Sequence, residues 1–342
     1  MRFLVGFFRA IIPSKTQTIQ TLFCHMFVRR LTRCGGGGRS FLHLGHRRGF
    51  RGSGALHEVE RINLWTQPRS ASTSLMYSFK QRGDCLVVDE PLYAHYIAET
   101  GEQRPYQQQL FEEQSEDLNV VLNDVIFSET HKTVNEELIF FKHMGKQLLP
   151  GDDCKWILRC KNIILLRHPR KVLQSFHTSL ASTVNPSDSG VQDLRRIYQY
   201  ATEHGQHVPV VLNEDLLKRP EGTLAALCKS LDIPFTKNML RWEKGGIEEE
   251  GCWKHVWYHN SHATTGFTSP PTSPTFLRAS PEVEKACKYC LDDYMALKAK
   301  RVLPLPVLPD ERNKDIYVYV GGKLLHRDEA KISVFDSIVQ GG

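Results

Sequence analysis

The stretch INLWTQPRSASTSL, residues 62–75, decides the fold. It begins with apolar residues at strand length, continues through a short turn, and then shows helical spacing. A turn that ends a strand and opens a helix presents free backbone N–H groups and the positive end of the helix dipole, which suit a phosphate. The stretch therefore predicts a strand over 61–66, an anion-binding turn, and a helix over 73–82.

A second stretch, NIILLRHPRKVLQS at residues 162–175, repeats the arrangement. It predicts a strand over 161–167, with Arg167 at its end, and a long helix from 170 that carries Ser175. Each turn could instead have a purely structural role. In the first turn, the hydroxyls beside Arg69 could form an ordinary helix cap. In the second, Arg167 could be a salt-bridged residue at a strand end. Because both turns occur in the right order, we favour two anion-binding turns and a ligand phosphorylated at two places.

Strands and helices alternate along the chain. Further strands are expected at 85–89, 137–142 and 208–212, and helices near 92–99, 117–127, 144–149, 191–204, 221–231 and 281–299. This alternation predicts an α/β fold, a doubly wound parallel sheet with helices on both faces. The first turn is not a Walker A loop, because it lacks the glycine spacing and the Lys-Ser/Thr pair.

The two turns together resemble the signatures of sulfotransferases that use 3′-phosphoadenosine 5′-phosphosulfate (PAPS). The resemblance covers roughly residues 60–300 and implies a P-loop fold of the sulfotransferase type. It implies that Arg167 and Ser175 hold the 3′-phosphate. It also implies that the 5′-phosphosulfate lies on the first turn, formed by Arg69, Ser70, Ala71, Ser72, Thr73 and Ser74. More narrowly, Trp257-Tyr258-His259-Asn260 resembles domains that plants and algae attach to branched-chain aminotransferase-like proteins.

Three positions depart from the family pattern. Ala71 replaces a glycine, which is tolerable unless the backbone needs a positive φ there. Ser74 replaces a tryptophan that stacks on adenine in cytosolic members. Arg69 replaces the more frequent lysine; its guanidinium suits bidentate phosphate contact.

Sulfuryl transfer needs fixed positive charge and a base. We assign the stabilisation of the leaving group to Arg69. We assign the base to His143, which follows the apolar run 137–142 and so lies at the ligand-binding edge of the sheet. A histidine that only packs at the strand end is the alternative; His259 and His262 are rivals for the base, and His168 is interpreted as structural.

The predicted function is transfer of a sulfuryl group from PAPS to a hydroxyl or amine of a small-molecule or carbohydrate acceptor. The alternatives are a non-catalytic nucleotide-binding or regulatory module and a role in aminotransferase metabolism through a further domain. No metal site is expected; Cys287 and Cys290 form a lone CxxC that we interpret as two helix-packing thiols. Oligomeric state is left open.

Charge is unevenly distributed. Residues 1–57 hold ten of the 44 Lys and Arg and none of the 38 Asp and Glu, so the remainder is slightly acidic and a nucleic-acid partner is not favoured. The leader 1–57 is expected to be disordered, and its composition is typical of a mitochondrial or plastid transit peptide. A cytoplasmic or Golgi location is the alternative, and no membrane span is expected.

The chain changes character after the expected domain, 58–302. A proline-rich linker occupies 303–314, and 315–342 resembles the start of a branched-chain aminotransferase domain, predicting strand, turn and strand. The lysine that would bind pyridoxal phosphate in that domain has no counterpart here, so this cofactor is not expected. We interpret the chain as the front of a fusion protein.

Overall fold

The computed structural model describes residues 59–128, 130, 136–180, 184–268, 279–306, 317–320, 323–326 and 329. The predicted leader 1–57 lies outside these residues, as do parts of the predicted linker and C-terminal fragment.

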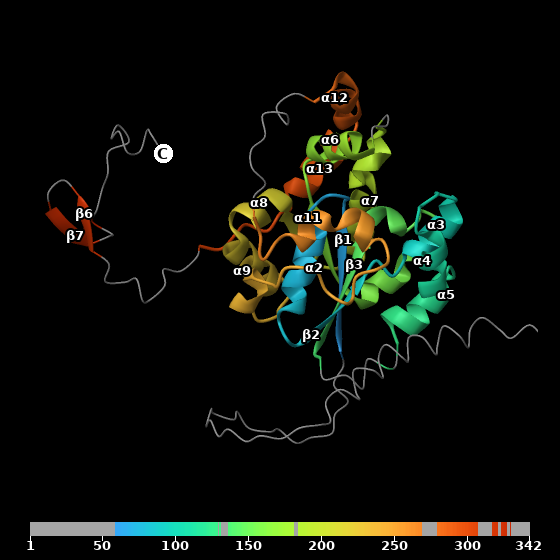
Figure 1. Ribbon diagram of the computed structural model, residues 1–342, viewed down its shortest axis with the longest axis horizontal. Coiled ribbons are helices and arrows are strands. Elements are labelled where there is room, and N and C mark those ends of the chain that lie inside the picture. The colour runs from blue at the N-terminus through green and yellow to red at the C-terminus, as the bar shows by residue number, and fades with distance from the viewer. Residues whose placement is uncertain are drawn as a thin grey trace, which may run out of the picture.

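The centre of the molecule is a five-stranded sheet with the order β2-β3-β1-β4-β5, in which every pair is parallel (Figure 1). The strands are β1 Glu60–Thr66, β2 Cys85–Asp89, β3 Leu138–Met144, β4 Lys161–Leu166 and β5 Val210–Leu212. The predicted parallel α/β fold is therefore confirmed.

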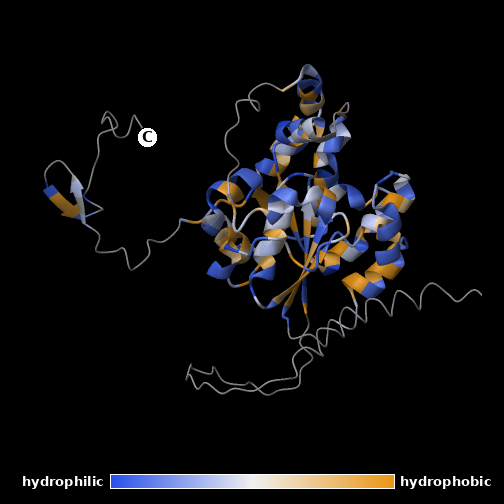
Figure 2. Ribbon diagram, in the orientation of Figure 1, coloured by the Kyte–Doolittle hydropathy of each residue, from blue (hydrophilic) through white to orange (hydrophobic). Residues whose placement is uncertain are grey.

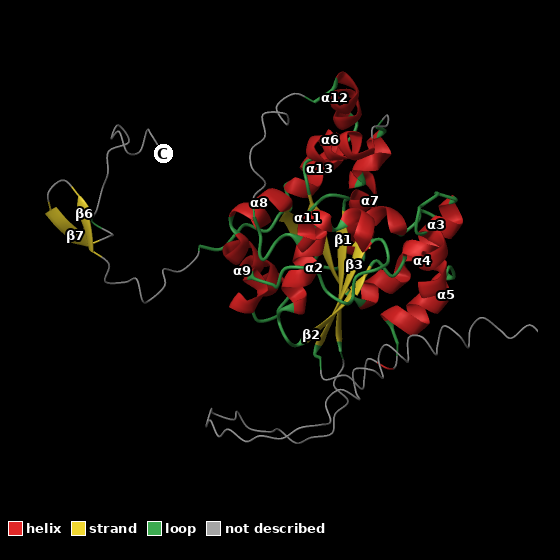
Figure 3. Ribbon diagram, in the orientation of Figure 1, coloured by secondary structure: helices red, strands yellow, loops and turns green. Residues whose placement is uncertain are grey.

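Helices lie on both sides of the sheet (Figure 3). They are α2 Ser72–Lys80, α3 Tyr93–Thr100, α4 Gln107–Glu113, α5 Leu118–Val121, α6 Pro169–Leu180, α7 Val191–Glu203, α8 Asn213–Lys218, α9 Pro220–Ser230, α10 Lys254–Trp257, α11 His259–His262, α12 Pro281–Lys288 and α13 Leu291–Lys298. Short 3₁₀ or π turns occupy Leu122–Ile126, Gly145–Gln147, Cys154–Arg159, Pro186–Ser189 and Lys237–Leu240. One helix was expected over 281–299, but the chain breaks into two between Lys288 and Leu291.

Two apolar clusters flank the sheet because side chains alternate along each strand. On one face Leu64 and Ile163 pack with residues of α2 and α9; on the other Trp65 and Ile164 pack with residues of α7 and α13. The strands accordingly carry much of the hydrophobic colouring in Figure 2. Since all five strands are parallel, their carboxyl ends share one edge, and the turns after β1 and β4 meet there.

The chain that follows α13 docks on the domain. Val302 donates its backbone N–H to Val210 of β5 at 2.9 Å, and Leu305 donates to the carbonyl of Gly222 in α9 at 2.9 Å. The first residues of the predicted linker are therefore held against the domain. Further on, β6 Tyr317–Val320 and β7 Lys323–His326 form the predicted antiparallel pair. None of the helices in the described residues has the length and apolarity to cross a bilayer.

Gly222→Ala is expected to disturb this docking. A Cβ at residue 222 would lie 2.3 Å from the carbonyl oxygen of Leu305, so the segment would have to move and its hydrogen bond to Gly222 would weaken. We expect the free energy of unfolding to fall by about 1–3 kcal/mol in denaturant titrations, with faster proteolysis after residue 300. Gly151→Ala is the matched control, because nothing lies within 4 Å of its added Cβ. Equal stability of the two variants would contradict the docking.

Candidate active site

The turn after β1 is fixed by its own polar groups. The Ser70 hydroxyl donates to the carbonyl of Gln67 at 2.7 Å and bonds the hydroxyl of Thr66, while Asn213 at the end of β5 donates its amide to the Ser70 carbonyl at 2.6 Å. The predicted turn residues Ser70, Ser72, Thr73 and Ser74 are all buried. These bonds hold the turn in one conformation at the carboxyl edge of the sheet.

No side chain caps helix α2. Its N-cap is Ala71, and the first helical bond runs from the Leu75 N–H to the Ala71 carbonyl at 3.1 Å. The alternative in which a hydroxyl of the turn merely caps this helix is therefore wrong. The N–H groups of Ser72, Thr73 and Ser74 are left without an intrahelical acceptor, which is the arrangement that receives an anion.

The turn is built from left-handed residues that are not glycine. Arg69 has a φ of 59° and Ala71 a φ of 64°. Ala71 is thus an unfavourable replacement for glycine, because its backbone has a positive φ. A residue with a Cβ pays about 1–2 kcal/mol in this left-handed conformation.

Ala71→Gly is expected to stabilise the protein by about 1 kcal/mol in denaturant titrations, since glycine adopts a positive φ without a Cβ clash. The same exchange at Ala296, inside α13, should instead destabilise by about 1 kcal/mol. If both variants lose stability to a similar extent, residue 71 is not under left-handed strain.

The second turn joins the first. The Arg167 backbone N–H donates to the Gln67 side chain at 2.7 Å, and its guanidinium Nη1 donates to the carbonyl of Arg69. Arg69 in turn donates Nε to the hydroxyl of Ser175, on α6, at 3.2 Å. The structure therefore brings together the three residues that the sequence predicted at two distant points of the chain.

The site carries two arginine charges that form no salt bridge to a described residue. Burial lowers the pKa of both Arg69 and Arg167. The pKa of Arg167 is partly restored by the negative charge of Glu214 and lowered further by the positive charge of Arg69. Within the described part of the chain, neither guanidinium forms a salt bridge, and the Glu214 carboxylate pairs with Lys171 instead. Arg167 Nε is buried with no hydrogen-bond partner among the described residues. The alternative of a salt-bridged Arg167 is thus not found there.

The structure does not place His143, the predicted base, where an acceptor could reach it. The imidazole is fully buried, its ring stacks on Trp65 at 4.5 Å, and its Nε2 lies 3.2 Å from the Asn63 amide oxygen. Burial, together with the charge of Lys142, lowers the pKa of His143 to about 3. The residue does lie at the carboxyl end of β3, but strand alternation directs it into the core, beside Phe141.

Lys142, which the sequence analysis passed over, points to the opposite face. Its ammonium contacts Asp89 Oδ1 at 2.8 Å, Glu90 Oε1 at 2.5 Å and the hydroxyl of Tyr258 at 2.6 Å. Burial raises the pKa of Asp89, and Lys142 offsets part of that rise. The acidic pair Asp89-Glu90 lies at the end of β2 and was the signal that could have located this cluster.

The other histidines occupy different settings. His262 Nε2 lies 2.9 Å and 3.1 Å from the two carboxylate oxygens of Glu250. His259 is exposed on the same short helix. His168 accepts from the Arg170 N–H at 3.2 Å and packs on Tyr294, which fits its structural interpretation.

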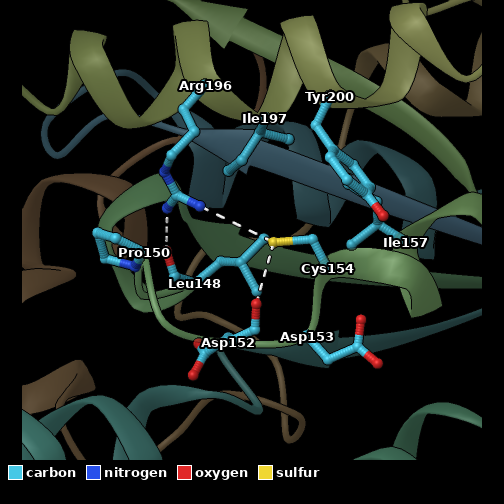
Figure 4. Close-up of a pocket in the computed structure, with 9 residues that line it drawn as sticks. All are labelled: Leu148, Pro150, Asp152, Asp153, Cys154, Ile157, Arg196, Ile197 and Tyr200. Atoms are coloured by element: carbon cyan, nitrogen blue, oxygen red, sulfur yellow. Dashed lines mark hydrogen bonds between the residues drawn. The ribbon is translucent and has the colours of Figure 1, made fainter.

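Two surface cavities lie away from the paired turns. One of about 380 Å³ lies between α7 and the turn Cys154–Arg159, where Arg196 reaches toward Leu148 and Cys154 (Figure 4). Another, of about 410 Å³, is lined by residues that include Trp242 and Phe267. Neither contains a residue of the predicted site. Among the described residues no group of His, Cys, Asp and Glu could hold a metal, and Cys287 and Cys290 are free buried thiols.

Solved structures to which this chain is similar include the sulfotransferase domain of the Synechococcus PCC 7002 olefin synthase, 15% identical with a TM-score of 0.44, covering 71% of this chain and 98% of that one. Mouse sulfotransferase SULT7A1 complexed with PAP is 13% identical with a TM-score of 0.39, covering 70% of this chain and 87% of that one.

Two relatives from Arabidopsis thaliana are branched-chain-amino-acid aminotransferase-like proteins 2 and 1. They are 37% and 38% identical over 291 and 296 residues, which is 83% of this chain and 51% and 52% of theirs. The chain thus spans about half the length of these curated relatives. Residues 60–300 match the family described as the sulfotransferase domain. On this match, which covers the five-stranded sheet and the turns after β1 and β4, the chain belongs to the sulfotransferase domain family.

Proposed function

We propose that this domain binds PAPS and transfers its sulfuryl group to a hydroxyl or amine of a small-molecule or carbohydrate acceptor. The observation that carries the proposal is the meeting of Arg69, Arg167 and Ser175 at one edge of the sheet, with no carboxylate paired to either guanidinium among the described residues. Two half-buried cations that no described carboxylate pairs with are costly unless an anion joins them.

Each turn would hold one end of the donor. The free N–H groups at the start of α2 and the Arg69 side chain suit the 5′-phosphosulfate. The unpartnered Arg167 Nε and the Ser175 hydroxyl suit the 3′-phosphate. Ser74 offers no ring to stack on the adenine, so other groups must hold the base.

During sulfuryl transfer, negative charge would develop on the leaving nucleotide, next to the positive charge of Arg69. When the bond between sulfur and the bridging oxygen breaks, that oxygen leaves with the electron pair on the nucleotide. A preorganised cation at this point lowers the barrier without reorganising during the reaction. Arg69, held by Ser175 and by the strained turn, is the group that would supply it.

A second candidate is a domain that binds the nucleotide without catalysis and regulates an attached enzyme. The burial of His143 favours it, because the strand-end base that the sequence predicted cannot reach an acceptor. Both candidates share the donor site, so binding alone does not separate them.

Incubation of the full chain with PAPS labelled with ³⁵S in the sulfuryl group tests the proposal. We expect release of labelled sulfate to water and labelling of alcohols or amines added as acceptors, at rates above those of the buffer. Saturable binding of PAPS without any such release would support the regulatory candidate. Absence of saturable binding would contradict both.

A further inference from the structure

We propose that His262 is the general base that takes the proton of the acceptor and that Glu250 orients its ring. This assignment rests on the proposed sulfuryl transfer and names the group that replaces the buried His143. A histidine whose one ring nitrogen is fixed by a carboxylate while the other is free is the usual arrangement of such a base.

The contacts around Glu250 are those of an orienting residue. Its side chain is only 1% exposed, whereas that of His262 is 24% exposed. One carboxylate oxygen accepts from the hydroxyl of Tyr77, and both lie within 3.1 Å of His262 Nε2. The buried carboxylate is therefore held from one side by helix α2 and holds the partly exposed imidazole on the other.

The segment that carries the pair is anchored to helix α2 by Tyr77 and to the carboxyl end of β2 by Gly251. Tyr77 belongs to α2, five residues after its start at Ser72, which corresponds to a rise of about 7.5 Å along the helix. Gly251, next to Glu250, donates its N–H to Asp89 Oδ2 at the end of β2, at 3.3 Å. In Figure 1, α11 lies in front of α2 and β1. The segment that carries Glu250 and His262 thus covers the helix that opens at the phosphate turn.

The hydrogen bonds select one tautomer of His262. Because a carboxylate can only accept, the neutral ring that this contact favours has its proton on Nε2 and its lone pair on Nδ1. Nδ1 makes no hydrogen bond to a described residue, and the ring is partly exposed, so this nitrogen can face an acceptor. The groups that face the imidazole are Glu250, Tyr77 through that carboxylate, and Tyr258, whose ring meets it edge-on at 6.4 Å. Burial and Glu250 both raise the pKa of Tyr77, which keeps its hydroxyl protonated as a donor.

Sulfuryl transfer with His262 as the base breaks two bonds and forms two. The acceptor O–H or N–H bond breaks and its proton moves to His262 Nδ1, giving an imidazolium beside Glu250. The acceptor atom forms a bond to sulfur with the electron pair that is released. The bond between sulfur and the bridging phosphate oxygen breaks, and its pair leaves on the nucleotide beside Arg69.

Other candidate bases are less suited. The Lys142 ammonium is fully buried and bonded to two carboxylates, so it holds its proton. His259 is on the same short helix, but its side chain contacts no orienting carboxylate among the described residues.

The test uses His262→Gln, His262→Ala and Glu250→Gln in the full chain, with PAPS as donor and with water and methanol as acceptors that need no knowledge of the natural one. We expect His262→Gln to slow labelled sulfate release and methyl sulfate formation about 100-fold or more, because a positioned base contributes about 10²–10⁴. The wild-type rate should fall at acid pH, because a protonated imidazole cannot accept the proton of the acceptor. The rate of His262→Gln should not show this fall. Added imidazole should partly restore His262→Ala, and Glu250→Gln should fall between wild type and His262→Gln.

The exposed residue His255, on the preceding helix, provides the matched control, and His255→Gln should behave as wild type. Affinity for adenosine 3′,5′-bisphosphate (PAP), the donor without its sulfuryl group, should be unchanged in every variant, which separates a lost base from a lost donor site. Wild-type rates or an unchanged pH profile in His262→Gln would overturn the proposal, as would a loss confined to His259→Gln. Binding of PAP by the wild type without turnover of either acceptor would overturn it as well, whereas failure of the wild type to bind PAP would refute the proposed function itself.

Discussion

Arg69→Ala is expected to lower the rate of sulfuryl transfer about 1000-fold at saturating PAPS. Removal of one group that stabilises developing charge costs about 10²–10³ in rate, and a full cation in a buried turn lies at the upper end of this range. The Arg69 guanidinium is in place before the donor arrives, because it is fixed by the Ser175 hydroxyl. Single-turnover measurement of ³⁵S transfer isolates this step from donor binding.

Arg69→Lys should keep a substantial part of the rate, since it retains the charge although it loses the planar fork. The control is Arg219→Ala, between α8 and α9, where the arginine side chain is largely exposed and pairs with Asp215. If Arg69→Ala changed the affinity for PAPS but left the single-turnover rate intact, Arg69 would be a binding residue and our assignment to the leaving group would be incorrect.

Arg167→Ala is expected to weaken PAP binding about 100-fold in calorimetric titrations while leaving AMP binding nearly unchanged. The wild type should prefer PAP, because PAP has a 3′-phosphate to place on the Arg167 guanidinium and AMP has only the 5′-phosphate. A 100-fold loss corresponds to about 2.7 kcal/mol, within the range for truncating a buried charged partner.

The unliganded Arg167→Ala protein should keep most of its stability, since burial lowers the pKa of Arg167 and no described carboxylate forms a salt bridge with it. Ser175→Ala should show the same selectivity change with a smaller magnitude. A similar loss of affinity for PAP and AMP in Arg167→Ala would mean that the variant disturbs the whole turn and that the 3′-phosphate lies elsewhere.

The fold could be predicted because the apolar runs are short, β-branched and separated by helical patterns. The predicted strand 85–89 matches β2 residue for residue, and the predicted strand 161–167 differs from β4 by one residue. The docking of residues 302–305 could not be predicted, because it depends on a backbone contact with Gly222 that no local pattern encodes.

The candidate site was predictable where chemistry follows directly from the backbone. Arg167 directly follows β4, and Arg69 lies in the turn after β1. The carboxyl ends of parallel strands lie at one edge of the sheet, so the two residues meet there. The prediction for His143 failed because successive side chains of a strand point to opposite faces. The Lys142 side chain meets the carboxylates of Asp89 and Glu90, whereas the His143 ring packs in the core beside Trp65 and Phe141. Glu250 and His262 could not be linked, because they stand twelve positions apart with the short helices α10 and α11 in that interval, and only the folded segment brings them to 2.9 Å.

Thermal unfolding of the wild type with PAP and with AMP tests the central claim most directly. A ligand that binds only the folded state stabilises it by RT ln(1 + [L]/Kd), about 2.7 kcal/mol at a hundredfold excess over Kd. At equal concentrations, the account predicts a clearly larger rise in melting temperature with PAP, because the guanidiniums of residues 69 and 167 each receive a phosphate. The same melting temperature with the two nucleotides would contradict it.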